Sequence, residues 1–86
     1  MHFIHSRKKL NMDDVMELTC DSPCNFILTD DSGFTEYKQC GIFGYFGGHF
    51  KTFPARITVP HTGEWNIVID TPGGDPINAW NLRVIS

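Results

Sequence analysis

The sequence contains no long hydrophobic run. A helix that spans a bilayer needs about 20 apolar residues in succession, and no segment of the 86 residues approaches that length. The first ten residues, MHFIHSRKKL, reach their basic positions early and lack the basic-then-apolar order of a signal peptide. We therefore expect a cytoplasmic protein that does not bind a membrane.

Basic residues are also few. Seven Lys and Arg residues stand against ten Asp and Glu residues, which gives a formal net charge of −3. Three of the seven are adjacent, at Arg7, Lys8 and Lys9. Proteins that bind nucleic acid usually present a broad basic face to the phosphates. Because most of this chain is acidic, we expect no nucleic-acid partner.

Cysteine is scarce, and the count of three is odd. Secreted domains held by disulfides usually have an even number, so reduced cytoplasmic thiols are the simpler interpretation. Cys20, Cys24 and Cys40 could bind zinc together with His49, but such a site normally has a second closely spaced pair. Cys20 and Cys24 also fall on core-facing positions, where a free thiol behaves as a small apolar group. We therefore expect no metal.

No catalytic signature is present. Cys40 could act as a nucleophile if His49 or His61 lay within hydrogen-bond reach as a base. However, local motifs such as G-x-S-x-G are missing from the sequence. We therefore expect neither enzymatic activity nor a cofactor.

Several carboxylates stand at the ends of predicted strands. Asp30, Asp31 and Ser32 follow one strand, and Asp70 ends another. Their oxygens could surround a calcium ion if these strand ends were neighbours. Aspartate at a strand end more often caps a turn, and this is the interpretation that we prefer.

What the sequence does contain is a regular alternation of apolar and polar residues, which is typical of strands. Aromatic residues make up 13% of the chain and fill much of the thin core that a chain of this length can form. The positions expected to face inward are Met16, Leu18 and Cys20, then Cys24, Phe26 and Leu28, then Ala55, Ile57 and Val59, then Trp65, Ile67 and Ile69, and finally Trp80, Leu82 and Val84. Together with a short strand near the start and the segment 41–50, this gives seven or eight short strands. The pattern predicts an all-β fold in one domain over residues 1–86, a small antiparallel β-sandwich of jelly-roll or immunoglobulin-like topology.

The connections follow from turn chemistry. Asp21, Ser22 and Pro23 favour a turn, so residues 15–20 and 24–29 are predicted to pair as a hairpin. The stretch TDDSGF after them is predicted to be a polar loop. No segment shows an apolar stripe of helical period and length, so no helix is predicted.

The segment GIFGYFGGHF, residues 41–50, combines four aromatic residues with four glycines. Glycine within a strand usually marks a bulge or a close approach of backbone. Only one face of such a strand can lie inside a thin sandwich, so part of the aromatic surface should be exposed and available to a partner. We expect the partner contacts to come from Ile42, Phe43, Tyr45, Phe46 and His49.

A small-ligand module is the alternative function. Its site would use the aromatic faces of Tyr37 and Trp80 together with the loop TPGGDPIN, because flat apolar rings suit sugars and nucleotides. Trp80 lies on an inward position of the last predicted strand, which argues for its burial and against this alternative.

Most of the chain resembles a bacterial family, DUF1883. The segments that carry the resemblance are MHFIHS, MELTC, CNFILTDDSGFTEYK, YFGGHF, PARITVPHTGEWNIVID and LRVIS. The resemblance implies a compact all-β sandwich, sometimes fused to TIR-type domains, with no known activity and no catalytic residues to transfer. Residues 39–44, QCGIFG, depart from the basic and polar residues typical of that family. The resulting prediction is a non-catalytic recognition domain in bacterial defence or signalling, which binds a protein partner or a second copy of itself.

Overall fold

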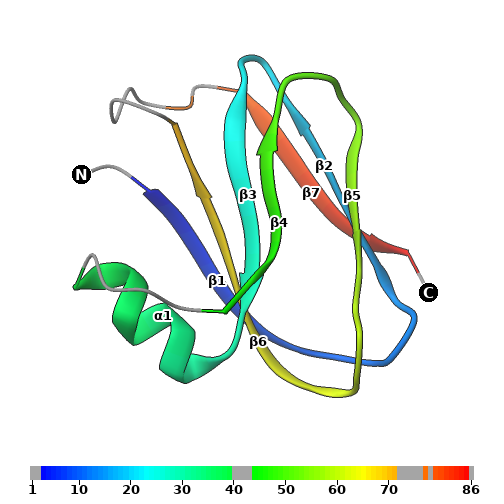
Figure 1. Ribbon diagram of the computed structural model, residues 1–86. Coiled ribbons are helices and arrows are strands. Elements are labelled where there is room, and N and C mark those ends of the chain that lie inside the picture. Colours follow the sequence, from blue (N-terminus) through cyan, green and yellow to red (C-terminus); the bar gives the residue numbers. More distant parts are fainter. Residues whose placement is uncertain (1–2, 40–43, 72–76, 78, 86) are drawn as a thin grey trace.

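The computed structural model describes residues 3–39, 44–71, 77 and 79–85, and within them seven strands and one short helix form a β-sandwich (Figure 1). One sheet has the strand order β1-β6-β3-β4 and the other the order β5-β2-β7, and all their strand pairs are antiparallel. The elements are β1 (Phe3–Leu10), β2 (Val15–Cys20), β3 (Cys24–Thr29), α1 (Asp31–Lys38), β4 (Phe46–Phe50), β5 (Ala55–Thr58), β6 (Gly63–Asp70) and β7 (Trp80–Ile85). The predicted all-β sandwich is confirmed.

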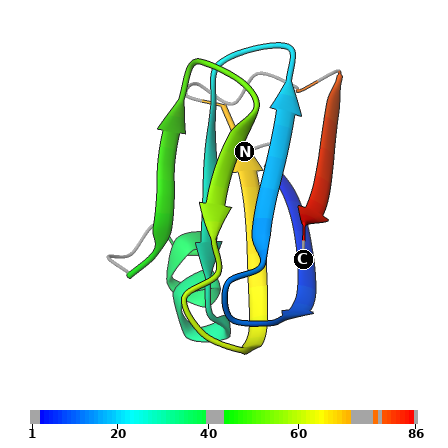
Figure 2. The same cartoon turned by 90° about the vertical axis from the view of Figure 1, so that its right-hand side faces the viewer.

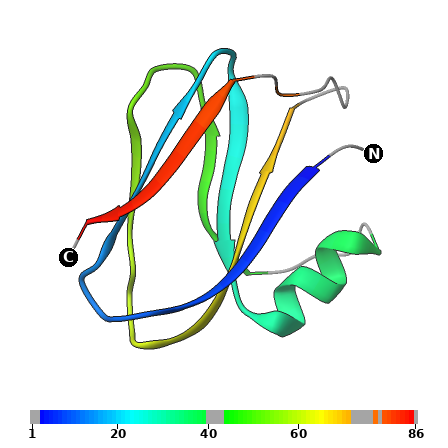
Figure 3. The ribbon, with the colours of Figure 1, turned by 180° about the vertical axis from the view of Figure 1, so that it is seen from behind.

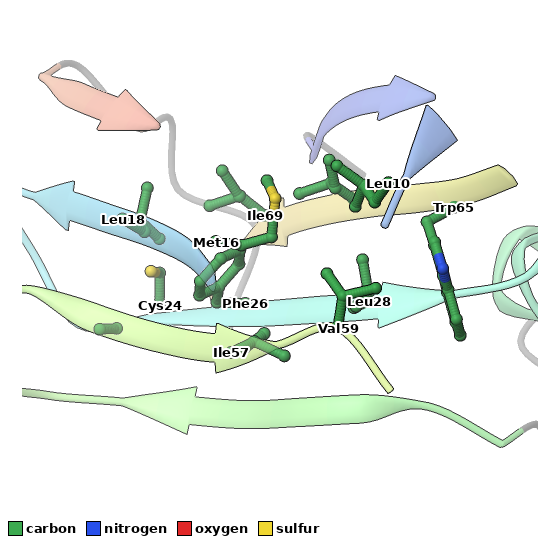
Figure 4. Close-up of a cluster of buried hydrophobic side chains, with 12 residues drawn as sticks. Leu10, Met16, Leu18, Cys24, Phe26, Leu28, Ile57, Val59, Trp65 and Ile69 are labelled. Atoms are coloured by element: carbon green, nitrogen blue, oxygen red, sulfur yellow. The ribbon is translucent and has the colours of Figure 1, made fainter. Parts of the chain in front are cut away.

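The hydrophobic core lies between the two sheets. Met16 and Leu18 on β2 face Phe26 on β3, and all three side chains are fully buried (Figure 4). Most of the positions predicted to face inward belong to this cluster or pack against it. Alternation therefore identified the core-facing side of the strands, because each strand has one face inside and one face outside.

The predicted hairpin of residues 15–20 with 24–29 is wrong. β2 pairs with β5 and β7, whereas β3 pairs with β4 and β6 in the other sheet. Asp21, Ser22 and Pro23 carry the chain from one layer to the other, and Figure 2 shows β2 and β3 in different layers. Both strands face the same core from opposite sides, so they show the alternation that a hairpin would show.

The loop predicted for TDDSGF, residues 29–34, is wrong as well, because helix α1 begins within it at Asp31 and continues to Lys38. Asp30 is the N-cap, and its Oδ1 accepts a hydrogen bond from the backbone N–H of Gly33 at 2.7 Å. Phe34 and Tyr37 face the sheet and cover Val68. A helix of eight residues has room for only two such contacts, so it shows no extended apolar stripe. α1 lies against the outer face of the β1-β6-β3-β4 sheet (Figure 3).

Trp80 is not buried as predicted, since 43% of its surface is exposed, although it shares the strand face of Leu82 and Val84. Leu82 and Val84 do pack against the core. Trp80 is the first residue of an edge strand and pairs with Cys20, the last residue of β2. It therefore lies at the end of the sheet, beyond the core cluster.

Candidate functional site

A pocket of about 370 Å³ lies on the outer face of the four-stranded sheet. Three strands and the helix each contribute to it, so segments distant in sequence meet there. Its lining residues are Asn25, Ile27, Tyr37, Tyr45, Gly48, His49 and Asp70. This volume lies within the range of small-molecule sites.

Asp70 is the charged group of the pocket and is buried. Its Oδ1 accepts a hydrogen bond from Asn25 Nδ2 at 2.6 Å, and its Oδ2 accepts one from the Tyr37 hydroxyl. His49 Nδ1 in turn donates to Asn25 Oδ1 at 3.1 Å. The network therefore fixes the orientation of the carboxylate and of the side chains around it.

Strand register explains why these residues meet. Asn25 on β3 is opposite Asp70 on β6 on one side and opposite His49 on β4 on the other. Directly opposed residues of antiparallel strands have neighbouring side chains. The row His49–Asn25–Asp70 thus crosses three strands, and Tyr37 reaches it from α1.

A second polar network attaches α1 to the sheet. Arg7 Nε and Nη2 donate to the two carboxylate oxygens of Asp31, each at 2.9 Å. Asn66 Nδ2 donates to Asp31 Oδ1 at 2.7 Å, and His5 Nε2 donates to Asn66 Oδ1 at the same distance. The hydrogen bond from Arg7 lowers the pKa of the Asp31 carboxyl to about 2. This network positions the helix that carries Tyr37.

The predicted partner residues fall partly within this region. Tyr45 and His49 line the pocket, and Phe46 begins β4 beside them. Tyr45 and Phe46 are 50% and 46% exposed, as expected for part of the aromatic surface. Ile42 and Phe43, also predicted to contact a partner, lie outside the described residues.

The glycines of β4 have backbone conformations that other residues rarely adopt. Gly47 and Gly48 have φ angles of 106° and 148°. A Cβ atom on Gly47 would lie 2.2 Å from the carbonyl oxygen of Phe26. The predicted close approach of backbone at a glycine is therefore confirmed at Gly47.

Cys20, Cys24 and His49, the candidate metal ligands that the structure describes, do not form a metal-binding group. Cys24 is fully buried, and burial raises the pKa of its thiol to about 12. His49 instead belongs to the Asn25 network, and Cys40 is outside the described residues. Within the described ranges, no group of three or more His, Cys, Asp or Glu side chains could hold a metal ion.

The four residues considered for calcium have separate roles. Asp30 caps α1, Asp31 pairs with Arg7, and Asp70 accepts hydrogen bonds in the pocket. Ser32 is exposed on the first turn of the helix. Asp30 does act as a cap, but it caps the start of a helix and not the turn that we expected.

The candidate bases also have structural neighbours. His61 lies with its ring centroid 4.8 Å from that of Trp65, and His49 donates to Asn25. Cys40, the nucleophile considered with them, lies outside the described residues. What the pocket offers chemically is a negative charge, hydrogen-bonding groups and two aromatic rings.

Tyr37 and Trp80, the aromatic residues of the small-ligand alternative, line different pockets. Trp80 contributes to a second pocket, also of about 370 Å³, at the point where β2 ends at Cys20 and Asp21 follows. Most of the loop 71–78 lies outside the described residues. The two rings therefore do not form one binding surface.

The contact between Asn25 and Asp70 was not predicted from the sequence. Alternation had already placed both on the outward side of their strands. The available signal was a polar residue on each of two apolar strands, but the register between strands 45 positions apart was needed to bring them together.

Comparison with known protein families gives a match over residues 1–85 with the family described as "Domain of unknown function (DUF1883)". None of the curated proteins and none of the solved structures compared with the chain matches it. In the described part of the chain, no helix is long and apolar enough to cross a membrane.

Proposed function

Since the chain belongs to the DUF1883 family, whose description assigns no function, we propose its role from geometry: it is a non-catalytic recognition domain that binds a protein partner through the edge of β4. The partner contributes an extended segment, which pairs with β4 as an additional strand. Main-chain hydrogen bonds supply part of the affinity, and the pocket beside β4 receives a side chain of the added strand.

The observation that carries this proposal is the composition of the four edge strands, β1, β4, β5 and β7. β1 contains three basic residues, β7 contains Arg83, and β5 contains Arg56 and is bracketed by Pro54 and Pro60. Charges and prolines are the usual means of protecting an edge from pairing. β4, with the sequence FGGHF, has no Lys, Arg, Asp, Glu or Pro. It is therefore the edge best suited to accept a strand.

The surroundings of β4 support the same conclusion. Exposed Tyr45 and Phe46 lie at its start, and aromatic residues commonly anchor interfaces. Gly48 has no side chain that could obstruct an approaching backbone, and it also lines the pocket. An added strand would place alternate side chains over the outer face of the sheet, where the pocket opens.

Extended peptides test the proposal. Seven-residue peptides that bind are selected from a random displayed library, and two N-methylated versions are made, one methylated at the odd and one at the even positions. Only one set of N–H groups can face β4, so one version should lose binding and the other should retain it. Amide hydrogen exchange should slow in β4 when peptide is added.

Two protein variants accompany this experiment. Phe46→Lys places a charge on the β4 edge and should abolish peptide binding, whereas Thr58→Lys places the same charge on the edge of β5 and should not. The proposal is wrong if both methylated peptides bind equally. It is also wrong if the peptide slows amide hydrogen exchange in β5 or β7 and not in β4. A dimer that Phe46→Lys dissociates would identify the partner as a second copy of the chain.

The small-ligand alternative now has a specific observation of its own, the pocket at Asp70. It predicts that a free small molecule raises the melting temperature, because binding to the native state alone stabilises it. A thermal-shift screen of sugars, nucleotides and small amines separates the two functions. A hit that needs no peptide backbone would favour the alternative.

A further inference from the structure

We propose that the pocket at Asp70 recognises an organic cation, the guanidinium or ammonium group of an arginine or lysine side chain. The inference rests on the proposed function for the source of that side chain, a strand added to β4. The cation specificity itself follows from the charge and the aromatic walls of the pocket.

Asp70 has no counter-ion among the residues that the structure describes. Its hydrogen-bond donors are the neutral groups of Asn25 and Tyr37, and none of the ion pairs among the described residues includes it. Buried carboxylates are usually paired with a cation. An incoming guanidinium or ammonium group would supply the missing charge.

The carboxylate also retains capacity to accept. Each oxygen of Asp70 accepts one hydrogen bond from the groups described above, and a carboxylate oxygen has two acceptor sites. A cationic donor can therefore bind without displacing Asn25 or Tyr37. Hydrogen bonds between charged groups are about twice as strong as neutral ones, which makes this the favoured contact.

Aromatic walls add to the preference. Tyr37 and Tyr45 both line the pocket, and the face of a tyrosine ring attracts a cation through its quadrupole. Lys and Arg are not among the described residues that line the pocket, so an anion would meet Asp70 with no compensating Lys or Arg from this part of the chain. An apolar side chain would leave the carboxylate desolvated and unpaired.

The experiment uses four peptides that differ at one position. Their sequence is acetyl-Thr-Val-Thr-Xaa-Thr-Val-Thr-amide, where Xaa is arginine, citrulline, lysine or norleucine. Citrulline has the shape of arginine without its charge, so the pair isolates the cation. Binding is followed by NMR titration of the labelled domain. We expect the arginine peptide to bind about tenfold more tightly than the citrulline peptide, and lysine to exceed norleucine.

Protein variants assign the preference to the pocket. Asp70→Asn should bring the arginine and citrulline affinities together while leaving the citrulline peptide bound. If Asp70→Asn does not fold, Tyr45→Ala, a change at an exposed wall of the pocket, takes its place. It should reduce the ratio of arginine-peptide to citrulline-peptide affinity, and Tyr45→Phe should keep that ratio. Trp80→Ala, at the other pocket, is the matched control and should leave the ratio unchanged.

The outcomes separate this inference from strand addition. Equal affinity of the arginine and citrulline peptides, with both protecting β4, would overturn the cation site but leave the proposed function intact. If no peptide engages β4, strand addition fails, and arginine amide is then titrated alone. If arginine amide shifts the NMR signals of Asn25 and His49 and Asp70→Asn abolishes these shifts, the cation site stands as a site for a free small molecule. If the signals do not shift, the cation site is overturned.

Discussion

The hydroxyl of Tyr37 donates a hydrogen bond to the carboxylate of Asp70, and this bond links helix α1 to the end of β6. The two residues are 33 positions apart in the sequence. The helix is short and contacts the sheet through few side chains, so this bond and the Arg7–Asp31 ion pair hold it at its two ends.

Removing the Tyr37 hydroxyl should destabilise the fold. Tyr37→Phe keeps the ring in contact with Val68 but leaves Asp70 with one donor fewer. A hydrogen bond to a charged group contributes about 1.5–3 kcal/mol, so we expect a loss of that order in the free energy of unfolding, measured by urea denaturation. In a double-mutant cycle with Asp70→Asn the two losses should not add. Additive losses would show that the two residues are not coupled.

The two glycines of β4 should differ sharply in their tolerance of alanine. Both have positive φ, which strains any other residue by about 1–3 kcal/mol. At Gly47 the added methyl group would also lie 2.2 Å from Phe26 O and 2.7 Å from Ile57 Cδ1, whereas at Gly48 no atom lies within 4 Å. Gly47→Ala should therefore destabilise clearly more than Gly48→Ala, as measured by thermal denaturation. Equal losses would mean that strain alone matters.

Acid should weaken the attachment of α1 through Asp31. The pKa of this carboxyl is lowered to about 2 from an ordinary value of 3.8, chiefly by the hydrogen bond from Arg7. A lowered pKa contributes stability that is present above the ordinary value and is lost as the pH falls from about 4 to about 2. Asp31→Asn should therefore lower stability at neutral pH and flatten its decline across this window.

The control for this prediction is Asp13→Asn. Asp13 forms no ion pair within the described ranges, and asparagine tolerates its φ of 72°. Urea midpoints at a series of pH values should give parallel curves for this variant and the wild type. A decline in Asp31→Asn as steep as in the wild type would contradict the role of Asp31.

Cysteine reactivity should separate Cys20 from Cys24. Burial raises the pKa of Cys24 to about 12, so its thiolate is scarcely populated at neutral pH. Cys20 is only partly buried and lines the second pocket. N-ethylmaleimide should label Cys20 in the native protein and Cys24 only after denaturation, as read by mass spectrometry of peptides. Labelling of both at similar rates would show that the core opens near Cys24.

Alternation in the sequence predicts individual strands better than it predicts which strands pair. Alternation placed Met16, Leu18, Phe26 and Leu28 correctly in the core, because one buried face is a local property of a strand. It could not tell that β2 and β3 belong to different sheets, since pairing depends on contacts far along the chain. The helix was not predicted because its main apolar contacts with the sheet are only two residues, Phe34 and Tyr37. Two residues do not make an apolar stripe of helical period.

In the candidate site, too, some individual residues were predicted but their contacts with one another were not. Composition and exposure pointed to Tyr45, Phe46 and His49, and two of these line the pocket. Asp70 and Asn25 were not predicted as a pair because their contact requires the register of β3 with β6. A polar residue at the end of an apolar strand gives no local indication of which side chain it will meet.

The passage of the chain between layers also determines when the domain can fold. β6 separates β1 from β3 in one sheet, and β7 completes the other. During synthesis, β1 and β3 therefore emerge long before β6, the strand that joins them. Their apolar faces remain exposed until β6 has been made. Folds dominated by such distant pairings form slowly and are exposed to aggregation while they wait. For this small domain, the arrival of β6 is the step that joins β1 and β3 into one sheet, and β7 then completes the second layer of the sandwich.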